Sequence, residues 1–324
     1  MVAAAGSGQG GGAARHYRLI NDITGAFNMT RAILVTGAGG QLGTELQRLA
    51  WPEAFEIVAI DQDELDLTDP AAIAAKVAER PWAAIINGAA YTAVDKAESD
   101  SVTAWQVNAL APAAFGQACA QVGIPLVQVS TDYVFPGDKQ GAWEVEDRVA
   151  PLGVYGASKL GGELAVRTSG ARHVIVRTAW VVSAHGNNFV KTMLRVGAER
   201  YALRVVADQQ GSPTGAADLA AALQTIALRL ATDDTAPTGT FHFSNAGPTN
   251  WAAFATEIFR QSALRGGPSA TVEPIATAEY PTPARRPANS LLSHDAIIAA
   301  YGITPRPWAE ALSDILDDLI GAAK

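Results

Sequence analysis

The sequence predicts an α/β fold in which a doubly wound parallel sheet is followed by a smaller α/β lobe. From about residue 31 to residue 178, short apolar runs typical of buried strands alternate with helical patterns, as expected for consecutive βαβ units. A glycine-rich turn at residues 37–43 joins the first apolar run to the first helical pattern. Together these observations indicate a Rossmann-type sheet, in which such a turn binds a dinucleotide.

Composition narrows the class of protein. The chain has 324 residues, of which 48% are apolar, and a formal charge of −8. That charge offers no positive surface for nucleic acid or an anionic membrane. Cys119 is the only cysteine, which excludes internal disulfides and a cysteine-built metal site. We therefore expect a cytoplasmic protein without nucleic-acid or membrane partners.

The first 28 residues differ from the rest. They are rich in Gly and Ala and contain no apolar block long enough for a signal peptide or a membrane span. We expect them to form a disordered leader. Met29 then precedes the first predicted strand, at about residues 31–36.

The glycine-rich turn and the strand after it predict a dinucleotide site. Gly37, Gly40 and Gly43 let the backbone approach a pyrophosphate at the helix N-terminus. A second strand, residues 56–60, ends in Asp61, where a carboxylate can bond the adenosine ribose. The predicted contacts from this unit are Gly37, Gly40, Gln41, Leu42, Gly43 and Asp61.

The next units supply further cofactor candidates. Residues 66–70 form a loop into a helix, with Asp69 as N-cap and Pro70 at the first helical position. A strand at 83–87 ends in small residues that suit the flat face of a nicotinamide and its ribose. A long helix at about 101–122 ends at Gly123, and Asn108 within it is either a surface amide or a bridge between backbone groups. The additional predicted cofactor contacts are Asp66, Leu67, Ala89, Ala90, Tyr91, Thr92, Ser130, Tyr155 and Lys159.

The stretch from Ser130 to Lys159 carries the candidate chemistry. Thr131 follows an apolar strand, while Tyr155 and Lys159 are four residues apart and share a helix face. A nearby cation lowers the pKa of a tyrosine from its usual value of ~10, which makes the phenol a usable general acid. The alternative is a half-buried tyrosine beside a snorkelling lysine.

Beyond the strand at 173–178 and Trp180 the alternation loosens. We predict a helix opened by Gly186-Asn187-Asn188-Phe189, a strand at 203–207, a helix at about 216–231, a strand at 240–243, and helices at about 250–261, 294–300 and 308–320. Residues 281–287 form a rigid basic loop. The expected division is a Rossmann domain at 29–180, to which about 203–230 returns, and a mainly substrate-binding lobe at 181–324. We assign the strand at 240–243 and the last three helices to that lobe.

Several segments together resemble a known family. They are Gly40-Gln41-Leu42-Gly43, Thr92-Ala93-Val94-Asp95-Lys96-Ala97-Glu98, Ser130-Thr131-Asp132-Tyr133-Val134-Phe135, Tyr155-Gly156 with Lys159-Leu160, Gly186-Asn187-Asn188-Phe189 and Arg286-Pro287. In order and content they resemble the dTDP-4-dehydrorhamnose reductases, which are extended short-chain dehydrogenase/reductases. The resemblance runs from about residue 31 to the C-terminus. The glycines and the Tyr-Lys pair are generic to the superfamily, whereas the Val-Asp-Lys-Ala-Glu, Gly-Asn-Asn-Phe and Arg-Pro segments are more specific.

The resemblance implies an activity and a set of roles. The activity is reduction of the C4 ketone of dTDP-4-dehydro-β-L-rhamnose to dTDP-β-L-rhamnose with NADH or NADPH. It implies Thr131, Tyr155 and Lys159 as catalytic residues, with Lys159 lowering the pKa of Tyr155. It also implies a substrate site formed by Val94, Thr131, Asp132, Tyr133, Trp180, Asn188 and Arg286.

One departure and two rival interpretations remain. Some family members are described as Mg²⁺-bridged dimers, but a glutamate used there aligns with Ala217, and Asp218 beside it would point elsewhere. We therefore expect no metal, and either a monomer or a homodimer.

Another nucleotide-sugar epimerase or dehydratase would share the fold, although a dehydratase needs an acidic pair after Thr131, where Asp132-Tyr133 stands. A regulatory subunit like the β subunit of methionine adenosyltransferase would not need the intact Thr131, Tyr155 and Lys159 set.

Overall fold

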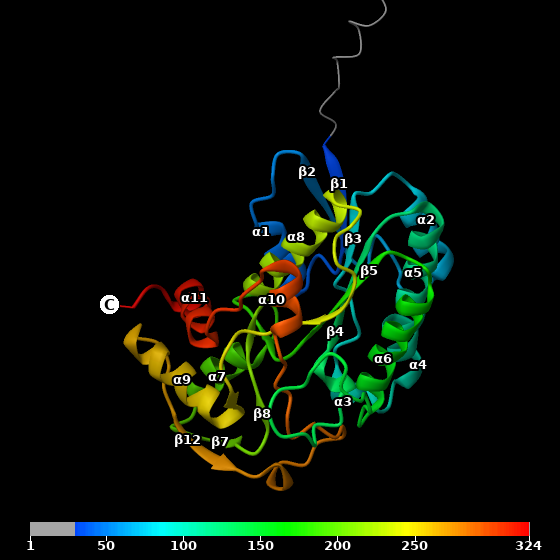
Figure 1. The fold of residues 1–324 in the computed structure, drawn as a ribbon. Helices are drawn as coiled ribbons and strands as arrows, with labels where there is room; N and C mark the ends of the chain where they lie inside the picture. The colour runs from blue at the N-terminus through cyan, green and yellow to red at the C-terminus, as the bar shows by residue number, and fades with distance from the viewer. Residues whose placement is uncertain (1–29, 324) are drawn as a thin grey trace, which may run out of the picture.

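The computed structural model describes residues 30–323 and contains a central sheet flanked by helices, with a smaller lobe beside it (Figure 1). The predicted disordered leader, residues 1–28, lies outside the described residues. The six strands of the central sheet are β1 (Arg31–Thr36), β2 (Phe55–Ile60), β3 (Ala84–Asn87), β4 (Leu126–Thr131), β5 (His173–Thr178) and β10 (Gly239–His242). All pairs between them are parallel, in the order β10-β5-β4-β3-β1-β2. This confirms the predicted fold class.

The strand order places the ligand-binding edge. The chain moves outward from β1 to β2 and then returns to the other side of β1 to form β3. At such a switch point the loops leave the carboxyl ends of the strands in opposite directions, and a crevice opens between them.

The strand at the sheet's other edge corrects a prediction. Residues 239–242 pair with β5, so the strand predicted at 240–243 belongs to the central sheet and not to the lobe.

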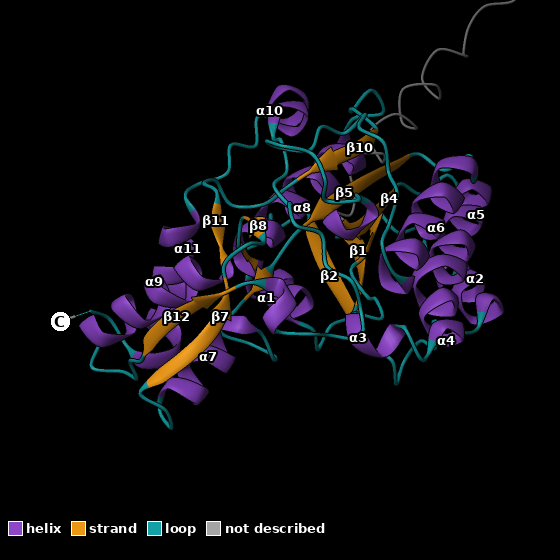
Figure 2. Cartoon of the chain, turned by 90° about the horizontal axis from the view of Figure 1, so that it is seen from below, coloured by secondary structure: helices purple, strands orange, loops and turns teal. Residues whose placement is uncertain are grey.

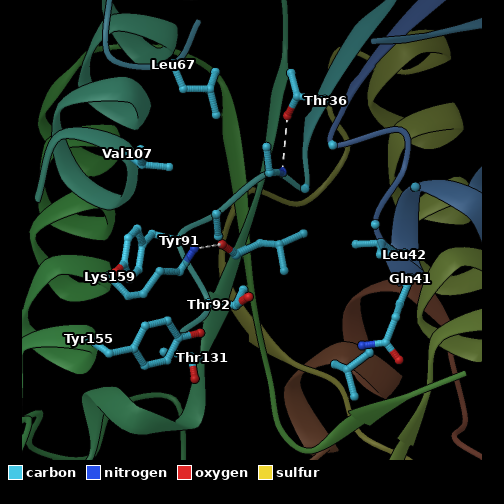
Figure 3. Close-up of a pocket in the computed structure, with 18 of the residues that line it drawn as sticks. Thr36, Gln41, Leu42, Leu67, Tyr91, Thr92, Val107, Thr131, Tyr155 and Lys159 are labelled. Atoms are coloured by element: carbon cyan, nitrogen blue, oxygen red, sulfur yellow. Dashed lines mark hydrogen bonds between the residues drawn. The ribbon is translucent and has the colours of Figure 1, made fainter. Parts of the chain in front are cut away.

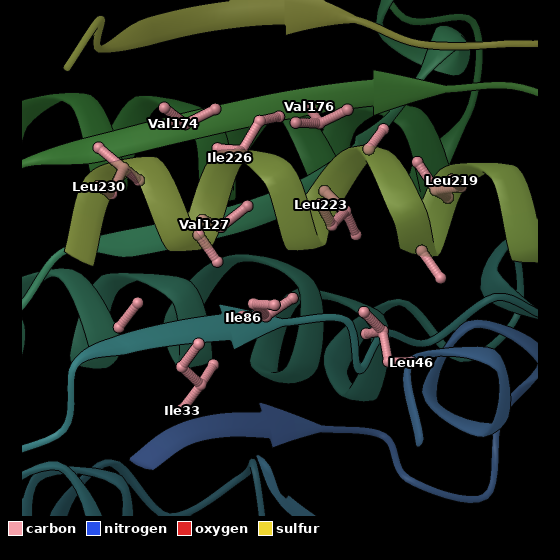
Figure 4. Close-up of a cluster of buried hydrophobic side chains, with 14 of the residues drawn as sticks. Ile33, Leu46, Ile86, Val127, Val174, Val176, Leu219, Leu223, Ile226 and Leu230 are labelled. Carbon is pink, nitrogen blue, oxygen red and sulfur yellow. The ribbon is translucent and has the colours of Figure 1, made fainter. Parts of the chain in front are cut away.

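Alternating side chains on the strands bury both faces of the sheet. Ile33 and Val35 point to one face, where they pack with α8 (Ala216–Thr232) (Figure 4). Ala32 and Leu34 point to the opposite face, towards α2 (Pro70–Ala78) and α5 (Ala111–Val122). This two-sided burial explains why the strands read as nearly continuous apolar runs. The helices on the two faces are α1 (Gln41–Arg48), α2 (Pro70–Ala78), α5 (Ala111–Val122), α6 (Val154–Thr168), α8 and α10 (Asp295–Tyr301). As predicted, Asp69 caps α2, with Pro70 in its first turn.

The long helix predicted at 101–122 is interrupted. It consists of α4 (Ser101–Trp105), a π-helical turn η1 (Gln106–Leu110) and α5, and Gly123 ends it with φ +72°. A short helix α3 (Val94–Ala97) precedes it. π-Helical turns often occur at functional sites. This one contains Asn108, which is buried, so the surface alternative for Asn108 is wrong.

The smaller lobe lies beside the carboxyl edge of the sheet (Figure 2). Its core is formed by α7 (Phe189–Gly197), α9 (Trp251–Leu264) and α11 (Trp308–Ile320), with the parallel pair β7 (Ala202–Val206) and β12 (Thr271–Ile275). The strand β12 was not predicted, because Glu273 and Pro274 interrupt an otherwise short and exposed run. Residues 203–230 were expected to return to the first domain. Strand β7 does not, because it pairs with β12 in the smaller lobe. Helix α8 does, because it packs on the central sheet.

Two further short strand pairs lie outside the central sheet. They are β6 (Val181–Val182) with β9 (Thr214–Gly215), and β8 (Gln210–Gly211) with β11 (Thr249–Asn250). Two 3₁₀ turns, η2 (Asp132–Val134) and η3 (Thr277–Glu279), complete the elements. Among residues 30–323, no helix combines the length and apolar character that a membrane crossing requires.

Candidate active site

A large cavity opens at the carboxyl ends of the parallel strands. It has a volume of about 880 Å³, and its walls come from the loops that follow β1, β2, β3, β4 and β5 (Figure 3). Every predicted cofactor residue and every predicted catalytic residue lines it. So do five of the seven predicted substrate residues: Val94, Thr131, Asp132, Tyr133 and Trp180. Asn188 and Arg286 do not.

The glycine turn fits a dinucleotide pyrophosphate. Gly37 has φ +81°, which favours glycine, and a Cβ at Gly43 would lie 2.0 Å from the Gly37 carbonyl oxygen. The backbone can therefore approach a ligand more closely than any residue with a side chain would allow. Helix α1 begins directly after Gly40 and has no side-chain cap. Its first N–H groups are thus available to an anion.

Asp61 lies across this turn at the end of β2. Its carboxylate accepts hydrogen bonds from the main-chain nitrogens of Gly39, at 2.7 Å, and Gln62, at 2.8 Å. A Cβ at Gly39 would lie 2.6 Å from Asp61 Oδ2, so glycine at this position makes room for the carboxylate. Asp61 therefore stands where the adenosine ribose was predicted.

Asn108 connects the two sides of the cavity. Its carbonyl accepts a hydrogen bond from Tyr91 N at 2.9 Å, and its amide donates to Tyr91 O at 3.0 Å and to Ser158 Oγ at 3.1 Å. Ser158 in turn donates to the main-chain oxygen of Tyr155. The loop after β3 is thus tied to helix α6. Spacing alone could not reveal this bridge, since the π-helical turn directs the side chain inwards.

Thr131, Tyr155 and Lys159 come together at the cavity floor (Figure 3). Tyr155 shares a hydrogen bond with Thr131, and its ring stands edge-on to Tyr133 with centroids 5.4 Å apart. Thr131 also donates to Asp132 Oδ1 at 3.0 Å. The Lys159 ammonium donates to the Val129 carbonyl at 2.7 Å. The structure therefore brings a phenol, a hydroxyl and an ammonium to one place.

The electrostatics of Tyr155 correct one expectation. Burial, together with the charge of Asp132, raises its pKa to about 12, while the hydrogen bond with Thr131 opposes the shift. Lys159 does not contribute to the shift, because its ammonium is turned to Val129. Lowering of the Tyr155 pKa by Lys159 was therefore wrong for this structure. A phenol with a raised pKa stays protonated at neutral pH, which a proton donor requires.

Two buried charges accompany this cluster. Burial lowers the pKa of Lys159 to about 8, although the carboxylate of Glu163 opposes the shift. Burial also raises the pKa of Asp132 to about 6, against hydrogen bonds with Ser290 and Thr131. Asp132 Oδ2 is buried and has no hydrogen-bond partner within residues 30–323. An unpaired buried carboxylate oxygen at a cavity wall suits a ligand donor such as a hydroxyl.

The Ser130 side chain is engaged elsewhere. Its hydroxyl donates to Glu163 Oε1 at 2.6 Å, and Arg177 holds both oxygens of Glu163 at 2.9 and 2.8 Å. Arg177 and Glu163 are each 1% exposed. Any cofactor contact from Ser130 therefore falls to its main chain. This buried pair was not predicted from the sequence, because Glu163 is on α6 and Arg177 is on β5.

Two predicted substrate residues have structural partners instead. Asn188 caps α7 by accepting from Lys191 N, and its amide donates to Gln41 Oε1 at 2.9 Å and to Ser183 O at 2.7 Å. The cavity wall at that point is Asn187. The guanidinium of Arg286 forms a two-point ion pair with Asp95, with N–O distances of 3.1 and 2.8 Å. Both side chains therefore have partners within the protein, and a substrate role for Asn188 and for Arg286 stays a prediction.

The possibility of a metal rested on the segment around Ala217. Asp218 is engaged by the Nε of Arg306 at 2.8 Å and by the amide of Asn245 at 2.7 Å. Within the described part of the chain, no three His, Cys, Asp or Glu side chains gather as metal ligands would. The absence of a metal stays a prediction.

Residues 30–320 match the family model described as the RmlD substrate binding domain. The dTDP-4-dehydrorhamnose reductase of Sinorhizobium fredii is 43% identical over 280 residues, covering 86% of this chain and 94% of that protein. The dTDP-4-dehydrorhamnose reductase of Escherichia coli is 39% identical over 293 residues, covering 89% of this chain and 97% of that protein.

A solved structure gives the same result. The dTDP-4-dehydrorhamnose reductase of Bacillus anthracis, in complex with NADP, superimposes with a TM-score of 0.82 at 38% identity, covering 89% of this chain and 99% of that one. A dTDP-glucose 4,6-dehydratase of Streptomyces venezuelae has a TM-score of 0.71 at 18% identity, covering 89% of this chain and 96% of that one; this likeness shows the fold alone.

The Rossmann-type sheet, the glycine cradle and the adjoining Thr131, Tyr155 and Lys159 cluster define a short-chain dehydrogenase/reductase, an oxidoreductase that uses a nicotinamide cofactor. Within that class, the chain belongs to the dTDP-4-dehydrorhamnose reductase family.

Proposed function

We propose that the protein reduces the C4 ketone of dTDP-4-dehydro-β-L-rhamnose to the alcohol of dTDP-β-L-rhamnose, with NADH or NADPH, in dTDP-L-rhamnose biosynthesis. The observation that carries the proposal is the position of protonated Tyr155 beside Thr131, in the same cavity as the glycine cradle. Family membership supports the choice of substrate.

The proposed chemistry divides between cofactor and protein. When bound, the reduced nicotinamide supplies the hydride that adds to the C4 carbon. Tyr155 donates its proton to the carbonyl oxygen, so that one hydride and one proton convert the ketone into a secondary alcohol. Positioned proton transfer of this kind typically contributes ~10²–10⁴-fold to a rate. When the sugar is bound, the Thr131 hydroxyl would turn from Asp132 Oδ1 and donate its one proton to the same carbonyl oxygen.

Lys159 is assigned to the cofactor, and Asp132 is assigned to the sugar. We assign the Lys159 ammonium to the nicotinamide ribose, because it lies one helical turn from Tyr155 on the inner face of α6. The buried Oδ2 of Asp132 would accept from a sugar hydroxyl. Val94, Tyr133 and Trp180 form the remaining substrate wall.

The proposal extends to organisation and setting. Residues 29–180 act as the Rossmann domain, with α8 returning to it, and most of 181–324 acts as the substrate lobe. We further infer a cytoplasmic enzyme, where NADH and NADPH are supplied, that works as a monomer or a homodimer.

The direct test is oxidation of NADH or NADPH by the purified protein with enzymatically made dTDP-4-dehydro-β-L-rhamnose. The matched control is a UDP-linked 4-keto sugar. We expect turnover of the dTDP sugar at least ~10-fold more efficient than that of the UDP sugar, a difference of ~1.4 kcal/mol in transition-state binding. No oxidation with the dTDP sugar would refute the proposal. Tightly bound NAD⁺ retained through purification would instead favour an epimerase or a dehydratase.

A further inference from the structure

Trp180 has an unusual backbone conformation at the cavity wall. It is the single non-glycine residue with positive φ among residues 30–323, at +50°, and it lines the cavity. A left-handed conformation costs a non-glycine residue ~1–3 kcal/mol and persists only where the surroundings enforce it. Such strain is concentrated at functional sites, so the contacts that hold Trp180 are of interest.

The indole of Trp180 is held by two residues outside the cavity. Its ring stacks on Trp251, with centroids 3.6 Å apart and planes 15° from parallel. Gly211 lies on it so closely that a Cβ there would be 2.5 Å from Cε2 and 2.6 Å from Cζ2 of Trp180. Neither Trp251 nor Gly211 lines the cavity. Trp251 also packs against Phe189, with centroids 4.6 Å apart, but Trp180 is the cavity-lining side chain that both residues contact.

Both partners come from one small antiparallel ribbon. Gly211 ends β8, and Trp251 directly follows β11, in which Thr249 pairs with Gly211 and Asn250 with Gln210. The ribbon is anchored on its other side, because Gln210 N donates to Ala288 O and Ser290 N donates to Gln210 O, each at 2.8 Å. The side chain of Ser290 lies close enough to Asp132 to lower the pKa of that carboxyl. The ribbon thus joins the Trp180 wall to the segment that contacts the buried carboxylate.

We propose that Trp251 and Gly211 are positioning residues for the sugar nucleotide, which hold the Trp180 indole at the cavity wall by stacking and by close approach. The inference rests on the proposed function, since it assigns Trp180 to the substrate side of the cavity. It goes beyond that function, because it makes sugar binding depend on the β8–β11 ribbon, which the substrate does not touch. The cofactor end of the cavity is independent of that ribbon.

The experiment compares Trp251→Ala and Trp251→Phe with wild type and with Trp180→Ala. A stacked aromatic pair stabilises the position of its rings beyond the area that it buries. Loss of this stacking in Trp251→Ala should therefore raise KM for the dTDP-4-keto sugar ~3–10-fold. The KM for NADH and the kcat at saturation should stay within ~2-fold of wild type. The variant loses sugar binding that is equal in the ground state and the transition state, and such a loss raises KM without changing kcat. Trp251→Phe keeps an aromatic face and should restore most of the affinity. The near-ultraviolet circular dichroism of the indole pair should change in Trp251→Ala and in Trp180→Ala alike.

Trp308→Ala is the matched control for loosening of the lobe. Trp308 begins α11 as Trp251 begins α9, and it packs edge-on against Phe254 rather than on Trp180. This variant should lower Tm without raising the sugar KM. Gly211→Ala moves the indole by a second route and should raise the sugar KM without affecting NADH.

A double variant, Trp180→Ala with Trp251→Ala, measures the coupling. If Trp251 acts through Trp180, the double variant should show the KM of Trp180→Ala alone, because the second change removes nothing further. Additive effects, an unchanged sugar KM in folded Trp251→Ala, or a parallel rise in KM for NADH would each overturn the inference while wild-type turnover upholds the proposed function. A wild-type protein without turnover of the dTDP sugar would refute both.

Discussion

The cofactor end and the substrate end of the cavity are built in different ways. The cofactor end consists of contiguous turns at strand ends, such as Gly37–Gly43 after β1, and main-chain groups define much of its shape. The substrate end is assembled from distant segments held by side chains, including Trp180 on Trp251 and Arg286 on Asp95. Damage to a single side chain should therefore affect sugar binding more readily than cofactor binding. The catalytic cluster lies where the two ends meet.

The largest expected effect is at that meeting point. Tyr155→Phe removes the proton donor and leaves the ring against Tyr133, so kcat should fall at least ~100-fold while cofactor binding persists. Steady-state rates and NADH titration measure the two quantities. Near wild-type turnover in this variant would remove Tyr155 from the mechanism.

Arg286 and Asp95 test how the substrate end is held together. Arg286→Ala should raise KM for the sugar nucleotide ~10-fold or more, since a hydrogen bond to a charged group is worth ~1.5–3 kcal/mol, and NADH binding should not change. Asp95→Ala separates two causes. A similar rise in KM means that the ion pair holds the loop, whereas an unchanged or lower KM means that Arg286 itself binds the diphosphate. No change in either variant would make the pair a surface feature.

The residues predicted for the cofactor end all line the cavity, and there is a physical reason. The glycine turn, Asp61 and the Thr131, Tyr155 and Lys159 set occupy positions that local strand–turn–helix patterns define. The internal partners of Asn188 and Arg286, which are Gln41 and Asp95, could not be predicted because they are distant in the chain. The strand at 240–243 was assigned to the wrong unit for the same reason, since its pairing with β5 is non-local. The raised pKa of Tyr155 comes from burial, which spacing does not reveal.

Asp61 tests the cofactor end through the choice of cofactor. Its carboxylate can accept from the ribose hydroxyls of NADH, whereas a 2′-phosphate ~4 Å away would be repelled by ~4 kcal/mol per charge pair at an effective dielectric of ~20. Ala38, Gly39, Gln41 and Gln62 offer no cation there. We expect NADH to be used at least as well as NADPH. Asp61→Ala should lose ~10-fold in kcat/KM for NADH and keep or gain efficiency with NADPH.

The ratio of kcat/KM values for the two cofactors decides this point. A wild-type preference for NADPH above ~10-fold, or ~1.4 kcal/mol, would mean that a basic residue from another segment outweighs Asp61.

The smallest expected effect is a pH dependence. Burial lowers the pKa of Lys159 to about 8, so its positive charge is present below that pH and is lost as the pH rises through it. If the charge holds the nicotinamide ribose, KM for NADH should rise on the alkaline side, by ~2-fold at the pKa, where half of the lysine is neutral. Lys159→Arg should move this limb to higher pH, because arginine stays charged. A flat KM profile between pH 7 and pH 9 in wild type would exclude this role for Lys159.

The central claim is that this cavity carries hydride to C4 of the sugar and a proton to its oxygen. NADH deuterated at the transferred position of nicotinamide C4, incubated with dTDP-4-dehydro-β-L-rhamnose and the wild-type protein, tests the claim by NMR of the product. The account predicts one deuterium on C4 of dTDP-β-L-rhamnose and none at other carbons. Deuterium at another carbon, or cofactor oxidation without a reduced sugar, would contradict it.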